Sequence, residues 1–98
     1  MQREFIDFME DHIGKVRVAM TAEIEAIMES IGELNCVGED LGITDARGDV
    51  YITTIFYDIF AKCVAVKDET GFVHNVADLG TDDMVAIYEF VYNKEFAN

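Results

Sequence analysis

The first third of the chain has the hydrophobic spacing of one amphipathic helix. Its apolar positions follow one another at intervals of three and four residues: Ile6, Met9, Ile13, Val16, Met20, Ile24, Ile27, Ile31 and Leu34. At about 100° per residue these side chains share a stripe about 80° wide. The spacing predicts a helix over residues 2–34, with Gly32, Asn35 and Gly38 as its stop signals.

A helix of this length is difficult to place within a small domain. If it is continuous it measures about 50 Å, whereas a domain of this size has an expected radius of gyration of about 13 Å. Either the helix breaks, near Gly14 or at Thr21 as a new N-cap, or its protruding half packs against another chain. We favour one long or kinked helix that contributes to a homodimer.

The middle of the chain changes to the composition of β-strands. Residues 50–56 are β-branched and aromatic throughout, which predicts a strand. A second strand is predicted over residues 59–66, and a third, over 72–76, follows a hairpin turn at 68–71. A short strand over residues 41–44 could pair with the first through a turn at 45–48.

The last segment, residues 82–95, is predicted to be a second helix. Thr81 is its expected N-cap, and the apolar face comprises Met84, Ile87, Tyr88, Val91 and Tyr92. The predicted fold is one α+β domain over residues 1–98: a helical segment at 1–34, an antiparallel meander of three or four strands at 41–77, and the C-terminal helix. Both helices are expected on one face of the sheet.

Charge narrows the range of partners. Asp and Glu number 20 against 7 Lys and Arg, which gives a net charge of −13 on a chain of 98 residues that is 51% hydrophobic. Such a chain should fold, since disordered acidic tails have a much lower apolar content. Direct binding to nucleic acid or to an anionic membrane is disfavoured, because both carry the same sign of charge as the protein.

Two further features predict a cytoplasmic protein. The first seven residues carry acids where a signal peptide needs an apolar run. The two cysteines, Cys36 and Cys63, are too few for a disulfide scaffold.

The outer face of the first helix carries a row of carboxylates, opposite the apolar stripe. We take these as the candidate partner-binding residues: Glu4, Asp7, Asp11, Glu25, Glu29 and Glu33. Like charges four residues apart cost about 0.2–0.5 kcal/mol per pair, and only Lys15, at i+4 from Asp11, partners the row. The row is either a solvated helix face or an anionic surface that imitates a nucleic-acid backbone and engages a basic groove of another protein.

Residue types that could carry catalysis or bind a metal form no recognisable motif. His12 and His74 are the only histidines, and neither has a second histidine at metal-ligand spacing. Cys63 and His74 could face each other across neighbouring strands as nucleophile and base, although a buried and inert Cys63 is the simpler interpretation. We therefore expect no cofactor, no metal and no enzymatic activity.

Aromatic residues exceed what one small core comfortably encloses. They include Tyr51, Tyr57, Tyr88, Tyr92, Phe56, Phe60, Phe72, Phe90 and Phe96. Most are expected in the core, but a few could form a dimer or partner patch on the sheet face that the helices leave uncovered.

These observations favour a small acidic protein-binding module that occupies a basic, nucleic-acid-binding surface of an enzyme. In size, charge and lack of proline the chain resembles the short acidic inhibitors that phages and mobile elements make against host nucleic-acid enzymes, including anti-CRISPR proteins. This resemblance covers no motif and assigns no residue. The alternative is a structural or assembly homodimer whose acidity serves only solubility.

Overall fold

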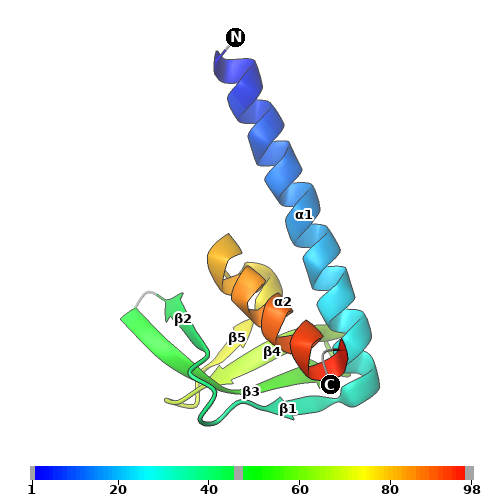
Figure 1. Ribbon diagram of the computed structural model, residues 1–98, viewed down its shortest axis with the longest axis vertical. Coiled ribbons are helices and arrows are strands. Elements are labelled where there is room, and N and C mark those ends of the chain that lie inside the picture. The colour runs from blue at the N-terminus through cyan, green and yellow to red at the C-terminus, as the bar shows by residue number, and fades with distance from the viewer. Residues whose placement is uncertain (1, 46–47, 97–98) are drawn as a thin grey trace.

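The chain forms two helices and a small antiparallel sheet, which confirms the α+β prediction (Figure 1). The computed structural model describes the backbone of residues 2–45 and 48–96, and the side chains of residues 11–44 and 48–96. The elements in chain order are α1 (Gln2–Ile31), β1 (Glu33–Asn35), β2 (Gly42–Asp45), β3 (Gly48–Asp58), β4 (Cys63–Asp68), β5 (Val73–Asn75), the 3-10 helix η1 (Val76–Asp78) and α2 (Thr81–Phe96).

The long strand β3 organises the sheet. Strands follow the order β1-β3-β4-β5, and β2 pairs with the first residues of β3, all of them antiparallel. The pairing of β2 with β3 confirms the short strand that was predicted before residue 45. Ile55 lies opposite Val66 of β4 and Leu34 of β1, so these three residues share one face of the sheet.

That face carries the core, and both helices cover it (Figure 1). Apolar side chains of α1 and α2 pack with those of β3 and β4, and the most deeply buried include Ile24, Met28, Ile52, Ile55, Val64, Val66, Met84, Ile87 and Val91. On α2 the predicted apolar face is buried at Met84, Ile87 and Val91, whereas Tyr88 is half-buried and Tyr92 is exposed. The helices thus close one side of the sheet and leave the other uncovered.

Helix α1 ends three residues earlier than its apolar spacing predicts. Gly32 adopts φ +87°, and its N–H donates to the carbonyl of Met28 at 2.6 Å, which closes the last turn. Glu33 and Leu34 therefore belong to β1, so the prediction of helix to residue 34 was wrong. Leu34 still reaches the core, but from the sheet.

The helix is continuous, as we favoured, and does not break at either of the two points that the sequence left open. Gly14 and Thr21 both lie inside the continuous helix Gln2–Ile31, and the Thr21 hydroxyl donates to the carbonyl of Arg17 at 2.8 Å instead of capping a new helix. The N-terminal part of α1 consequently stands clear of the sheet and of α2 (Figure 1). The longest dimension of the molecule is 46 Å, against 30 Å and 29 Å for the others.

Two other boundaries differ from their predictions. Residues 59–62 form the turn between β3 and β4, so the second strand begins at Cys63 and not at Ile59. Helix α2 begins at Thr81, but the carbonyl of Gly80 accepts the first helical N–H, from Met84 at 2.9 Å. Gly80 is therefore the N-cap in place of Thr81. Within the described residues, neither helix is both long and apolar enough to cross a membrane.

Candidate protein-binding surface

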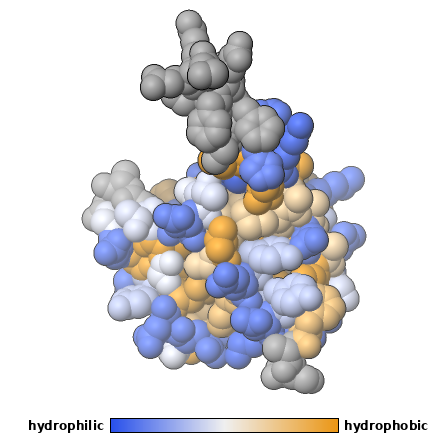
Figure 2. Space-filling view, turned by 45° about the horizontal axis from the view of Figure 1, so that its top comes forward, coloured by the Kyte–Doolittle hydropathy of each residue, from blue (hydrophilic) through white to orange (hydrophobic). Residues whose placement is uncertain are grey.

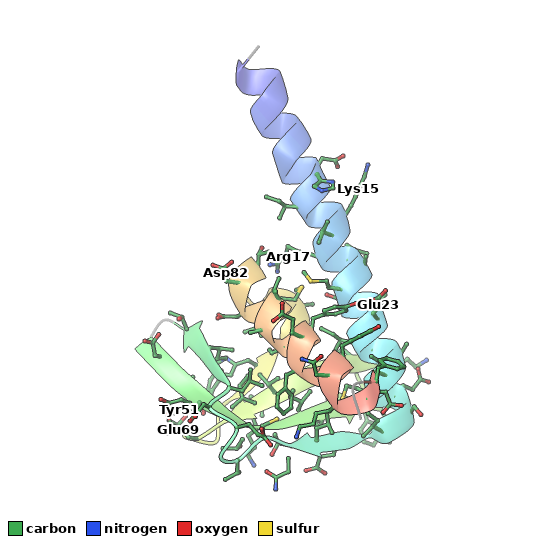
Figure 3. The ribbon with its side chains drawn as sticks, viewed as in Figure 1. Lys15, Arg17, Glu23, Tyr51, Glu69 and Asp82 are labelled. Carbon is green, nitrogen blue, oxygen red and sulfur yellow. The ribbon has the colours of Figure 1, made fainter. Side chains whose placement is uncertain are left out.

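Arg17 fastens α1 to the rest of the domain at the point where the helix leaves it. Its guanidinium donates to the Thr81 hydroxyl at 2.9 Å and to the carbonyls of Leu79 at 2.6 Å and Ala77 at 3.2 Å (Figure 3). These carbonyls lie at the end of η1, where a cation is favoured. A second contact between the helices is made by the Tyr88 hydroxyl of α2, which donates to the carboxylate of Glu23. Sequence reasoning had singled out neither contact.

Beyond Arg17 the helix continues over residues 2–16, which we call the projecting segment. Its length is about 22 Å at 1.5 Å per residue. Ile13 is 42% exposed and Val16 is 40% exposed, although both lie on the stripe that Ile24 continues into the core. Figure 2 shows hydrophobic surface at the foot of this segment, where the helix meets the body of the domain. The stripe therefore extends past the part of the sheet that could bury it.

The predicted carboxylate row is divided between different environments. Glu4 and Asp7 lie on the helical backbone of the projecting segment, but their side chains fall outside the described part of the structure. The Asp11 carboxylate pairs with the Lys15 ammonium at 3.1 Å, as their spacing suggested. Glu33 is not on the helix at all, because it lies in β1.

Glu25 and Glu29 remain together on α1, one turn apart, and their charges act on the end of the sheet where β3 turns into β4. Burial, followed by the charges of Glu29 and Glu25, raises the pKa of the Tyr57 hydroxyl. Burial also raises the pKa of the Cys63 thiol, and Asp58 and Glu25 add to that effect. Glu25 and Glu29 thus contribute a negative potential at the β3–β4 end of the domain.

The same end of the domain carries an exposed apolar turn, residues 59–62, which we call the hairpin tip. Ile59 is 69% exposed and Phe60 is 92% exposed. The Asp58 carboxylate accepts the backbone N–H of Phe60 at 2.9 Å and that of Ala61 at 3.1 Å, and its carbonyl accepts the N–H of Lys62 at 2.7 Å. Ile59 and Phe60 are residue types that favour a strand, which explains the prediction. An Asp side chain that accepts the N–H groups of the following residues is, however, typical of a turn.

Aromatic exposure is not confined to the uncovered sheet face. Tyr51 and Phe56 alternate with the core residues of β3 and so face away from the helices, with Tyr51 exposed and Phe56 half-buried. Phe60 lies on the hairpin tip, and Phe96 lies in the last turn of α2.

The structure separates the one nucleophile–base pair that the sequence allowed. His74 lies opposite Val66 and shares its face of the sheet, whereas Cys63 alternates with Val64 and faces the other side. The His74 ring instead bonds the buried Asp68 carboxylate, with Nε2 and Oδ2 2.8 Å apart. The Cys63–His74 interpretation was therefore wrong.

The second cysteine, Cys36, lies in the core. Burial raises the pKa of the Cys36 thiol to about 11, so it stays protonated near neutral pH. Among the side chains that the structure describes, no three His, Cys, Asp or Glu residues come together as metal ligands would.

Comparison with known proteins adds no further constraint. Neither a protein-family model, nor a curated protein, nor a solved structure matches this chain.

Proposed function

We propose that this chain is a small acidic protein-binding module that docks on a basic surface of another protein, with the projecting segment of α1 as its docking element. The observation that carries the proposal is the exposed apolar stripe of that segment, at Ile13 and Val16. An isolated helix of about 15 residues is only marginally stable in water. An apolar groove on a partner would bury the stripe and stabilise the helix.

The sign of the charge indicates the kind of partner. The chain carries −13 overall, and the projecting segment has Glu4, Asp7 and Asp11 on the side away from its stripe. These carboxylates, together with the net negative charge of the chain, attract a partner with a basic surface and speed its encounter with the helix. In the form that this charge favours most, that basic surface is the nucleic-acid-binding surface of an enzyme, which the module inhibits by occupying it.

Two matched variants test the docking element. Ile13→Ser with Val16→Ser removes the exposed stripe, whereas Val18→Ser removes an exposed valine from nearly the opposite side of the same helix. We expect the immobilised wild-type chain to retain a basic protein from an extract of its native cells at low salt. The Val18→Ser variant should retain it equally, and the double variant at least about tenfold less.

Salt and competing DNA then identify the surface. A contact that depends on charge should weaken steeply towards about 0.5 M NaCl, and duplex DNA should displace the module from a nucleic-acid groove. Equal retention by all three chains would show that the projecting segment is not the docking element. Displacement by neither salt nor DNA would rule out the basic surface.

The second candidate function is assembly as a homodimer. The same exposed stripe favours a homodimer, because a second copy of the chain could also bury the stripe. Light scattering on the purified chain from micromolar to millimolar concentration separates the two. A dimer that Ile13→Ser with Val16→Ser dissociates, together with no retained partner, would favour assembly. A monomer at all concentrations would favour the heterologous partner.

A further inference from the structure

The hairpin tip holds its shape without burying its two large apolar side chains. Hydrogen bonds to the carboxylate and carbonyl of Asp58 fix the backbone of Phe60, Ala61 and Lys62. Lys62 adopts φ +55°, a left-handed conformation that is unfavourable for a residue with a side chain. The fold thus supports a strained turn at which Ile59 and Phe60 remain in solvent. Their bulk contributes little to the stability of the domain.

The surroundings of the tip are acidic. Asp58 lies at its base, and α1, which carries Glu25 and Glu29 one turn apart, contacts both of the strands that the tip joins. Within the four residues of the turn, Lys62 carries the one positive charge. An apolar projection beside carboxylates is complementary to an apolar hollow beside cationic side chains.

We propose that the hairpin tip is an anchor that inserts Phe60 into an apolar pocket of a partner protein, and that lysine or arginine side chains at the rim of this pocket pair with Glu25 and Glu29. Aromatic side chains that fill such pockets are typical of the energetic centre of an interface. A fixed turn loses little conformational freedom when it binds. The inference rests on the proposed function only for the existence of a protein partner, because the tip is a different surface from the projecting segment.

A lipid bilayer is the less suitable occupant. Anionic headgroups repel a chain of net charge −13, and the carboxylates near the tip would have to approach the interface with it.

The variant that tests the anchor is Phe60→Ser, matched to Phe96→Ser, which removes another exposed phenylalanine from the end of α2. We expect Phe60→Ser to leave the melting temperature unchanged and to reduce retention of the partner at least about tenfold. Phe96→Ser should change neither. Glu25→Gln with Glu29→Gln should reduce retention at low salt more than at high salt, whereas Glu89→Gln should not.

Cross-linking then identifies the pocket. With the photoreactive residue benzoylphenylalanine in place of Phe60, the cross-linked partner peptide should contain apolar residues with lysine or arginine nearby. The proposal is overturned if Phe60→Ser binds as well as the wild type, if it lowers the melting temperature, or if no partner is retained. It is also overturned if the cross-link joins two copies of this chain, or if phosphatidylcholine vesicles bind the wild type but not Phe60→Ser. One result would refute the anchor alone: Phe60→Ser retains the partner as well as the wild type does, whereas the double variant Ile13→Ser, Val16→Ser does not retain it. The proposed function would then still stand.

Discussion

Asp68 is a buried carboxylate whose pKa is strongly shifted by its hydrogen bonds. Its side chain is buried at the end of β4, and its carboxylate accepts the N–H groups of Thr70 at 2.8 Å and Phe72 at 3.1 Å. The Thr70 hydroxyl also donates to this carboxylate, and the His74 ring bonds it through Nε2. Burial alone would raise the pKa of this carboxyl, but the hydrogen bonds outweigh burial and hold the pKa well below its usual range.

The depressed pKa predicts how stability depends on pH. Since the carboxyl binds its proton more weakly in the folded chain, its contribution is complete above the unfolded pKa of about 3.9 and is lost as pH falls towards the folded value. Asp68→Asn should lower the melting temperature at pH 7 by about 5–10 °C.

The melting temperatures of the two chains should begin to converge as pH falls below about 4 and should approach each other further towards pH 2, as calorimetry can measure. Glu89→Gln, which removes an exposed charge from α2, is the control and should follow the wild type. A constant difference between Asp68→Asn and the wild type down to pH 2 would refute the assigned role of the carboxylate.

At the scale of elements, a glycine inside α1 and another directly after it should respond to substitution in opposite ways. Gly32 closes the helix at φ +87°, where a side chain is strained. Gly14 lies within the helix, and among the described residues a Cβ added there would meet nothing within 4 Å beyond the backbone of its own helical turns. Gly32→Ala should therefore lower the free energy of unfolding by about 1–2 kcal/mol. Gly14→Ala should stabilise the helix locally by up to about 1 kcal/mol.

Urea unfolding measures the first change, and amide hydrogen exchange over residues 11–20 measures the second. Slower exchange in Gly14→Ala with little change in the urea midpoint would agree with a projecting segment that opens independently of the core. If Gly32→Ala were as stable as the wild type, the left-handed closure of α1 would not be needed.

The sequence predicted the type of each major element better than its ends. Periodicity identified α1 and α2 because their stripes are long, but Leu34 and Ile59 fit two periods equally well. Leu34 continues the helical spacing, and only the backbone conformation of Gly32 assigns it to β1. Ile59 continues a run of strand formers, and only the hydrogen bonds of Asp58 assign it to a turn.

The candidate surface was predictable only in part, for a related reason. Spacing alone identified the stripe of α1, since it depends on a single helix. The effect of Glu25 and Glu29 on β3 depends on how α1 crosses the sheet, which is a contact between residues distant in sequence. The contacts of Arg17 with η1 are equally long-range.

For the whole molecule, a net charge of −13 makes self-repulsion a general cost to the folded state. Raising NaCl from 0.01 M to 1 M shortens the screening length from about 30 Å to about 3 Å, so the melting temperature should rise. The rise should be smaller in a chain with Glu25→Gln, Glu29→Gln and Glu89→Gln together. Thermal unfolding in NaCl measures both, and a melting temperature that fell with salt would show that attractive ion pairs dominate.

Because α1 is fastened at Arg17 and extends about 22 Å beyond it, the helix is a lever arm with its pivot in the domain. A tilt of about 10° at the pivot moves the far end of the arm by about 4 Å. Interior substitutions that change how Met28 or Ile87 packs would redirect this end without touching it. Such substitutions can therefore change where the projecting segment points while its own residues and the fold stay the same, and if this segment is the docking element we propose, they would change binding as well.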